Sequence, residues 1–205
     1  SVPPEENEDT TEAEALQSPS ECACRFRSSY IIVDTETTGL NPHSDKIIQL
    51  SAIKYDANGR PVDSFSTYIN PGRPIPPSAT KINGITDEMV LHAPFAEQIC
   101  DKFLSFLGDS LLVGYNVTFD LRFLEQTFQS FSGRSYVDVL TIARQRLTLP
   151  NYKLETVASS FAFQPKTAFH DALTDCEAVA LILCCVAEDL DDWIKVFQPS
   201  LPHAH

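Results

Sequence analysis

The chain has 205 residues, with 15 lysine and arginine residues against 28 aspartate and glutamate residues and a formal net charge of −13. This length supports one compact α/β domain and is too short for two full domains. No apolar run approaches the roughly 18 residues of a membrane helix, and the N-terminus is acidic rather than a basic leader. We therefore expect a cytoplasmic protein with no membrane partner. The charge also argues against a nucleic-acid surface built mainly from lysine and arginine.

The negative charge is concentrated at the N-terminus, where residues 1–21 hold seven acids and no base. Residues 1–25 are rich in Glu, Pro, Thr and Ser and cannot bury enough apolar surface to fold. They are predicted to be a disordered acidic linker or tail. Because the chain begins at Ser1 rather than Met, we expect a piece of a longer protein, joined through this linker to a fused domain or a protein partner. One folded domain is expected over residues 26–197, with a flexible C-terminus over 198–205.

The folded part alternates between strand and helix patterns. Asn58-Gly59 is the strongest short signal of a β-hairpin and joins the second and third predicted strands. The apolar patterns predict strands over residues 30–34, 46–56, 61–70, 111–113 and 136–137, and helices over 95–107, 118–131, 138–147, 153–162 and 171–188. This order predicts a mixed sheet flanked by helices.

Two carboxylates follow the first buried strand, in the stretch IIVDTETTG that contains Asp34 and Glu36. Side chains at positions i and i+2 of a strand point the same way, so these two carboxylates lie close together. Close like charges raise each other's pKa and are unfavourable unless a cation lies between them. The stretch therefore indicates a metal site, although such a pair alone is a weak signal and is often only a solvated strand end.

Three further polar residues stand in or next to predicted helices. Asp120 falls in the first turn of a predicted helix, where a carboxylate is commonly explained by the helix dipole. His170 and Asp175 open the longest predicted helix, and a lone histidine at such a position is more often structural than catalytic. The combination of a histidine with three separate acidic sites favours a catalytic centre.

These residues resemble the motifs of a known family, the DnaQ-like 3′–5′ exonucleases of the DEDDh group. The matching segments are Asp34-Thr-Glu36-Thr-Thr-Gly39, Ile82-Asn-Gly84-Ile85-Thr86-Asp-Glu88-Met89, Asn116-Val-Thr-Phe119-Asp120 and His170-Asp-Ala-Leu-Thr-Asp175. The resemblance covers roughly residues 28–188 in the family's order. It implies an α/β fold of the ribonuclease-H-like type, with a five-stranded mixed sheet whose second strand is antiparallel and with helices on both faces.

The resemblance also implies a chemistry, in which two divalent ions, Mg²⁺ or Mn²⁺, support hydrolysis of a phosphodiester. Hard cations of this kind prefer carboxylate oxygens, which suits a ligand set without cysteine. The implied metal ligands are Asp34, Glu36, Asp120 and Asp175. His170 is the implied general base, since an imidazole with an ordinary pKa of about 6.5 is mostly neutral above pH 7.

Five residues are implied to contact the terminal nucleotide. Thr37, Gly39 and Leu40 resemble the family's pocket for that nucleotide, with Leu40 wedged against a base, and Asn116 and Phe119 resemble residues beside the terminal sugar and base. Phe119 is equally explained as a core residue. The chain carries Tyr115 where many members have histidine, which changes local sugar contacts but no implied metal ligand.

The expected substrate is a single-stranded 3′ end of DNA, or of RNA. The expected role is proofreading or end trimming, with strand delivery left to a partner. One alternative within the class is a DnaQ-like domain that trims new spacers as part of a CRISPR adaptation protein. An alternative from another class is a non-catalytic module that binds or scaffolds nucleic acid; it predicts a replaced metal ligand, and none is replaced here.

Overall fold

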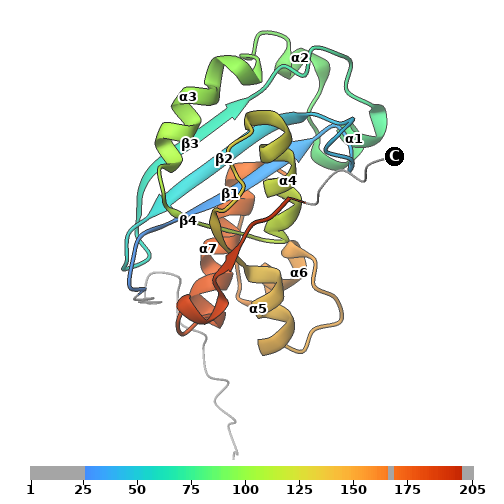
Figure 1. Ribbon diagram of the computed structural model, residues 1–205. Coiled ribbons are helices and arrows are strands. Elements are labelled where there is room, and N and C mark those ends of the chain that lie inside the picture. The colour runs from blue at the N-terminus through green and yellow to red at the C-terminus, as the bar shows by residue number, and fades with distance from the viewer. Residues whose placement is uncertain (1–25, 166–168, 200–205) are drawn as a thin grey trace, which may run out of the picture.

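The computed structural model describes residues 26–165 and 169–199. The expected acidic tail of residues 1–25 and most of the expected flexible C-terminus, residues 200–205, lie outside this part. The strands of the described part are β1 (Tyr30–Thr37), β2 (Ile47–Tyr55), β3 (Pro61–Tyr68), β4 (Leu111–Gly114), β5 (Ser135–Asp138) and β6 (Lys195–Val196). They form one sheet in the order β3-β2-β1-β4-β5-β6 (Figure 1).

The direction of the strands confirms the predicted mixed sheet. β2 runs antiparallel to β1 and to β3, whereas β4 is parallel to β1 and β5 is parallel to β4. The hairpin between β2 and β3 turns at Gly59, whose φ of 73° suits glycine. The count of five strands was one too low. β6 pairs antiparallel with β5 through two exposed residues, too few to give an apolar pattern in the sequence.

The helices differ from the expectation mainly by two short additions. The described helices are α1 (Pro77–Asn83), α2 (Asp87–Val90), α3 (Ala96–Leu107), α4 (Val117–Phe128), α5 (Val139–Arg146), α6 (Leu154–Ser160), α7 (Ala172–Val186) and the 3-10 turn η1 (Asp191–Trp193). α1 and α2 were not predicted, because seven and four residues are too short to show a helical apolar repeat. No helix in the described ranges combines the length and apolar character needed to span a membrane.

Two hydrophobic clusters cover the two faces of the sheet. On one face Tyr30 and Ile32 of β1 pack with α5, α6 and α7. On the other, Ile31 and Val33 pack with α3 and α4, and Figure 1 shows these two groups of helices on either side of the strands. β1 is therefore buried on both faces, and the direction in which each of its side chains points decides which helices it meets.

We predict that Phe103→Ala lowers the free energy of unfolding by about 3–5 kcal/mol. Phe103 is fully buried on α3, and its ring centroid lies 5.2 Å from that of Phe65 and 5.5 Å from that of Phe128. Urea denaturation followed by circular dichroism measures the change. The matched control Phe95→Ala removes a half-exposed ring next to the same helix and is expected to cost about 1 kcal/mol or less; equal losses for the two variants would contradict the assigned core.

Candidate active site

The alternation along β1 separates its polar residues onto two faces. β1 extends to Thr37, so Asp34 and Glu36 lie within the strand rather than after it. Both belong to the face of Tyr30 and Ile32, against which α7 packs. Asp34 is partly buried and Glu36 is buried. The first pair of carboxylates therefore points toward the start of α7.

Asp120 approaches β1 from the opposite face of the sheet. It lies in the first turn of α4 and is 4% exposed. Its Oδ1 accepts hydrogen bonds from the backbone N–H of Thr35, at 3.0 Å, and from the Thr35 hydroxyl, at 2.6 Å. Thr35, between the two acids of β1, thus fixes a third carboxylate beside them.

The start of α7 is anchored to the sheet by a side-chain amide. Asp171 caps this helix by accepting a hydrogen bond from the backbone N–H of Thr174. Gln49 of β2 donates to Asp171 Oδ1 at 2.8 Å and accepts from the N–H of Ala172 at 3.2 Å. These contacts hold the first turn of α7 at the sheet, and Asp175 in that turn is buried.

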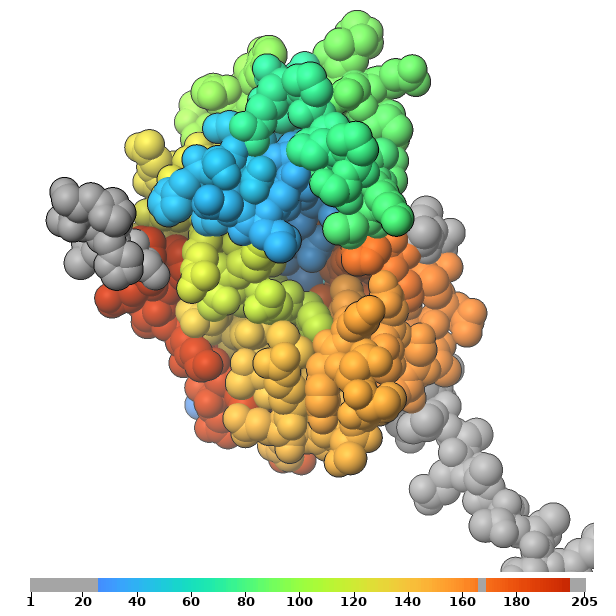
Figure 2. Space-filling view, turned by 90° about the vertical axis from the view of Figure 1, so that its right-hand side faces the viewer, coloured from blue at the N-terminus to red at the C-terminus, as the bar shows by residue number. Residues whose placement is uncertain are grey.

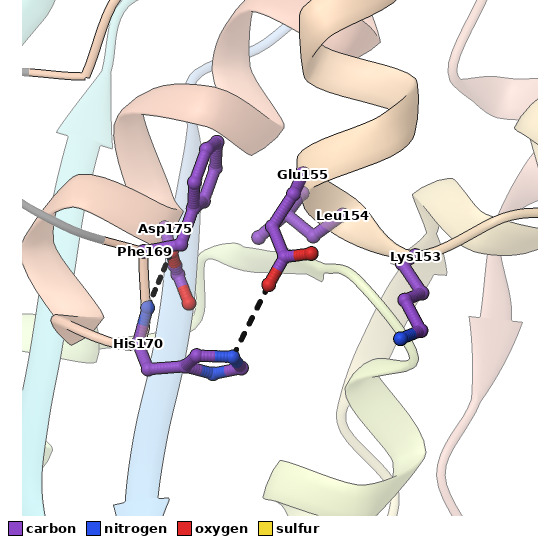
Figure 3. Close-up of a pocket in the computed structure, with 6 residues that line it drawn as sticks. All are labelled: Lys153, Leu154, Glu155, Phe169, His170 and Asp175. Carbon is purple, nitrogen blue, oxygen red and sulfur yellow. Dashed lines mark hydrogen bonds and ion pairs between the residues drawn. The ribbon is translucent and has the colours of Figure 1, made fainter. Parts of the chain in front are cut away.

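His170 precedes the cap of α7 in an unusual backbone conformation. Its φ is 68°, which is uncommon for a residue other than glycine. Its N–H points to Asp175 Oδ1 at 3.4 Å, and its Nε2 lies 3.2 Å from Glu155 Oε1 (Figure 3). Residues held in such conformations are concentrated at functional sites, where neighbouring contacts maintain them.

These elements enclose a pocket of about 200 Å³. Its lining residues are Asp34, Thr35, Glu36, Tyr115, Asn116, Phe119, Asp120, Leu154, His170 and Asp175. Figure 2 shows the hollow where the segment from β1 meets the α1 region and the chain around α6. The structure thus brings together all five predicted catalytic residues, with Asn116 and Phe119.

The other three predicted residues do not line this pocket. Thr37 ends β1, and its hydroxyl donates to the carbonyl oxygen of Gly39 at 2.6 Å. Leu40 follows on the loop and is 83% exposed. These residues therefore belong to the surface next to the pocket.

Burial raises the pKa of all four carboxyl groups, and repulsion from the other carboxylates of the site adds to the rise at Asp34 and Glu36. Burial is the main cause in each case; it raises the pKa of Glu36 to about 8, of Asp120 to about 7 and of Asp175 to about 6. The pKa of Asp34 is also raised, first by burial and then by the charges of Asp120 and Asp175. Hydrogen bonds from Thr35 oppose the rise at Asp120. Without a cation, the site favours protonated carboxyl groups.

The donor set suits a hard divalent cation. Glu36, His170 and Asp175 each offer a ligand atom, and these atoms lie within 4.8 Å of one another. Asp34 and Asp120 border the same pocket with further carboxylate oxygens. Oxygen-rich sites of this kind suit Mg²⁺ or Mn²⁺, and a divalent cation would offset the repulsion that raises the pKa values.

Several residues that shape the site were missed in the sequence analysis. Thr35 and Gln49 act through contacts with Asp120 and with α7 that are more than 80 positions distant in the chain, and no local pattern marks them. Glu155 was also missed, because it pairs with His170 only once α6 is folded. Asp171 could have been found, since an aspartate directly before an apolar helical repeat is a capping signal.

Residues 31–183 match the exonuclease family RNase_T. The chain therefore belongs to this exonuclease family, and the DnaQ-like 3′–5′ exonuclease class inferred from the motifs is confirmed.

Curated relatives include the DNA polymerase III PolC-type of Thermotoga maritima, which is 36% identical over 159 residues. This match covers 76% of the chain and 12% of the relative, so the chain spans only a small part of the polymerases that it resembles.

Two solved structures share the fold. Exonuclease X in complex with 5′ overhanging duplex DNA matches with a TM-score of 0.63 at 24% identity, covering 80% of this chain and 92% of that one. E. coli Exonuclease I in complex with a dT13 oligonucleotide matches with a TM-score of 0.66 at 22% identity, covering 78% of this chain and 41% of that one. The likeness supports the ribonuclease-H-like fold described above.

We predict that the metal-free protein loses stability as the pH rises from about 4 to about 8. The pKa values of Glu36, Asp120 and Asp175 are raised in the folded state to about 8, 7 and 6, while the unfolded chain has ordinary values near about 4. The folded state then binds more protons than the unfolded state across this range, so stability falls as the protons leave. Urea denaturation in EDTA at a series of pH values measures the slope.

Glu36→Gln should flatten this slope, most clearly between pH 7 and the pKa of about 8 assigned to Glu36. The control Glu97→Gln changes an exposed glutamate on α3 and should leave the slope as in the wild type. Addition of Mg²⁺ to the wild-type protein should raise its stability again at the alkaline end of the pH range, because a ligand that binds only the folded state stabilises that state. A wild-type profile that is flat in EDTA would contradict the clustered, raised pKa values.

Proposed function

We propose that this domain removes nucleotides from single-stranded 3′ ends of DNA with the aid of two divalent ions. The observation that carries the proposal is the convergence of Asp34, Glu36, Asp120 and Asp175, with His170, on one pocket. Buried carboxylates with raised pKa values need positive charge nearby, and a phosphodiester carries negative charge that needs the same cations. The family match of residues 31–183 supports the reaction class.

We assign a role to each of the five residues, and their positions in the pocket support the assignment. Asp34, Glu36, Asp120 and Asp175 would hold two ions, Mg²⁺ or Mn²⁺, which when bound generate a nucleophilic water and stabilise the leaving oxygen. Thr35 keeps Asp120 in place through two hydrogen bonds. His170 lines the same pocket and is exposed to solvent. It would accept the proton of the attacking water, for which a neutral imidazole is required.

The preference for a single strand rests on the shape of the site and on its relatives. The catalytic pocket of about 200 Å³ admits one flexible chain end more readily than a stacked base pair. Asn116 and Phe119 line it beside the carboxylates. We assign them, together with Thr37, Gly39 and Leu40 at its edge, to contacts with the terminal nucleotide. The complex of Exonuclease I with dT13 supports DNA as the substrate.

The setting that we propose is proofreading or end trimming within a larger protein. The PolC-type relative from Thermotoga maritima supports a polymerase-linked setting, since the match covers 12% of the length of that polymerase. Residues 26–197 would form the exonuclease domain of the DEDDh group, with residues 1–25 as an acidic linker and 198–205 as a flexible end. A cytoplasmic location fits this role.

The first test is a time course with 5′-labelled single-stranded DNA and RNA of one sequence, in Mg²⁺, in Mn²⁺ and in EDTA. We expect a ladder that shortens from the 3′ end only when a divalent ion is present, and faster with DNA. An intact substrate in both metals would favour the non-catalytic module, whereas endonucleolytic products would contradict the exonuclease.

We predict that Asp120→Asn reduces the rate at least about a hundredfold while the protein stays folded, because one metal ligand is lost. The rate on labelled DNA and the melting temperature are measured together. The control Asp101→Asn changes an exposed aspartate on α3 and should keep the full rate. A wild-type rate for Asp120→Asn would refute its role as a ligand.

We predict that His170→Ala slows hydrolysis by about 10²–10⁴-fold, the usual contribution of a general base, while metal affinity is retained. Isothermal titration with Mn²⁺ separates the two effects. If His170→Ala weakens Mn²⁺ binding as much as Asp120→Asn does, His170 is a ligand rather than the base.

A further inference from the structure

The loop between β1 and β2, residues 38–46, is closed at its base by two hydrogen bonds. The N–H of Thr38 donates to the carbonyl oxygen of Lys46 at 2.9 Å, and the N–H of Lys46 donates to the Thr38 hydroxyl at 3.0 Å. Since Thr38 follows Glu36 by two residues, this loop begins at the edge of the catalytic pocket. We call it the β1–β2 loop.

Leu40 lies between two pinned peptide groups of the β1–β2 loop. The carbonyl oxygen of Gly39 accepts from the Thr37 hydroxyl at 2.6 Å, and the N–H of Asn41 donates to Asp45 Oδ2 at 2.9 Å. The Leu40 side chain itself is 83% exposed. The loop thus fixes the backbone on both sides of an apolar side chain that is mostly exposed. Burial of Leu40 therefore does not account for the order of the loop.

Asp45 is the centre of this arrangement. Its carboxylate packs directly on Gly39, where a Cβ would lie 2.6 Å from Asp45 Cγ. The same carboxylate accepts from Asn41, and its Oδ1 lies 3.4 Å from the Thr38 hydroxyl. The position of Leu40 therefore depends on where the Asp45 side chain is held.

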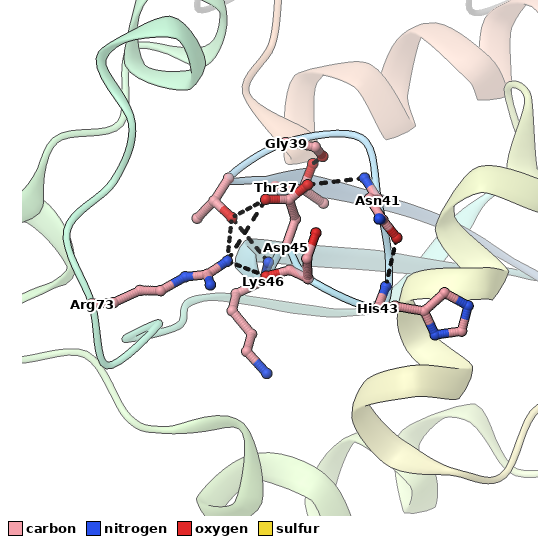
Figure 4. Close-up of polar contacts among 9 residues, drawn as sticks. Thr37, Gly39, Asn41, His43, Asp45, Lys46 and Arg73 are labelled. Atoms are coloured by element: carbon pink, nitrogen blue, oxygen red, sulfur yellow. Dashed lines mark hydrogen bonds and ion pairs between the residues drawn. The ribbon is translucent and has the colours of Figure 1, made fainter.

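Arg73 reaches the β1–β2 loop from a different segment of the chain (Figure 4). Its Nη2 donates to the carbonyl oxygen of Ser44 and lies 3.4 Å from the Thr38 hydroxyl and 3.7 Å from Asp45 Oδ1. One guanidinium therefore contacts both ends of the loop and the carboxylate between them. The fixed fork of N–H donors makes arginine suited to such a bridge.

The segment that carries Arg73 is itself restricted. Arg73 stands between Gly72 and Pro74 in the sequence NPGRPIPP. Pro74 restricts the backbone conformation of Arg73, the residue that precedes it. Gly72 has a φ of 68°, and its N–H donates to Asn70 Oδ1 at 2.9 Å. The anchor of the bridge is thus stiffer than an ordinary surface loop.

The ion pair alone does not explain this arrangement. The Arg73 side chain is 44% exposed and that of Asp45 is 21% exposed, and ion pairs open to solvent on one side add little to stability. What the contacts provide is order in a loop that presents Leu40. Ordering before binding lowers the entropic cost of the bound state, so the benefit appears when a ligand meets Leu40.

We propose that Arg73 is a positioning residue that determines how Leu40 meets the terminal base of the substrate strand. The proposal rests on the proposed function and extends it by naming the residue that orders Leu40. In the described residues, the polar contacts of Arg73 are with Thr38, Ser44 and Asp45, and none is with His170 or with the four carboxylates of the catalytic pocket. Its loss weakens capture of the strand end and leaves the chemistry of the bound end unchanged.

The test is a double-mutant cycle of Arg73→Ala and Leu40→Ala, with kcat and KM measured on single-stranded DNA. We expect each single variant to raise KM by about tenfold or less, which is the scale of a partly buried leucine contact, with kcat unchanged. In the Leu40→Ala background, Arg73→Ala should have no further effect, because its action passes through Leu40. Arg73→Lys, which keeps the charge and N–H donors but not the planar fork of the guanidinium, should recover part of the affinity.

The control Arg60→Ala removes an exposed arginine from the hairpin at the far end of β2 and should match the wild type. Independent, multiplying effects of the two variants would overturn the proposal, and so would a fall in kcat for Arg73→Ala. Melting temperatures within a few degrees of the wild type show that the variants are folded.

The same cycle, read as fluorescence anisotropy of a labelled oligonucleotide in Ca²⁺, separates this proposal from the proposed function. If the wild type releases no nucleotide, the proposed function fails, while binding still reports the coupling of Arg73 and Leu40. If the wild type cuts DNA but the two variants act independently in both measurements, only the positioning role fails.

Discussion

The repulsion between four acidic side chains in one small pocket is the constraint on which the structure depends. Burial raises the pKa of each carboxyl group, and repulsion within the site adds to the rise at Asp34 and Glu36, so unrestrained carboxylates would move apart. The fold opposes this from three directions. β1 fixes two acids through the sheet, Thr35 holds Asp120 from one face, and Gln49 fixes the start of α7 on the other. The carboxylates proposed as metal ligands are therefore already close together in the folded protein.

Much of the candidate site could be predicted from the sequence because the signals that mark its acidic residues are local. Asp34 and Glu36 share a face since they are two residues apart in a strand, and the family motifs located Asp120, His170 and Asp175. The contacts that hold them could not be predicted in the same way. Thr35 meets Asp120 across 85 positions and Gln49 meets Ala172 across 123, and such pairs become visible only when the sheet and helices are assembled.

Two parts of the site differ in how they are ordered. The carboxylates are held by the packed core and by buried hydrogen bonds. Leu40 stands on an exposed loop and is ordered by polar contacts with its own neighbours and with Arg73. The first arrangement suits a reaction that tolerates little change in geometry, while the second suits contact with bases of different shape.

The position of β1 between two hydrophobic clusters has a consequence for how the protein unfolds. Its residues contribute to the core on both faces, so no partial opening of one layer releases the strand that bears Asp34 and Glu36. Segments of this kind exchange their amide hydrogens only through global unfolding. Heat, denaturant or a core mutation would therefore reduce the fraction of folded molecules. It would not produce folded molecules in which Asp34 and Glu36 are misplaced. The arrangement of these two carboxylates and the fold of the domain are therefore lost in a single unfolding transition.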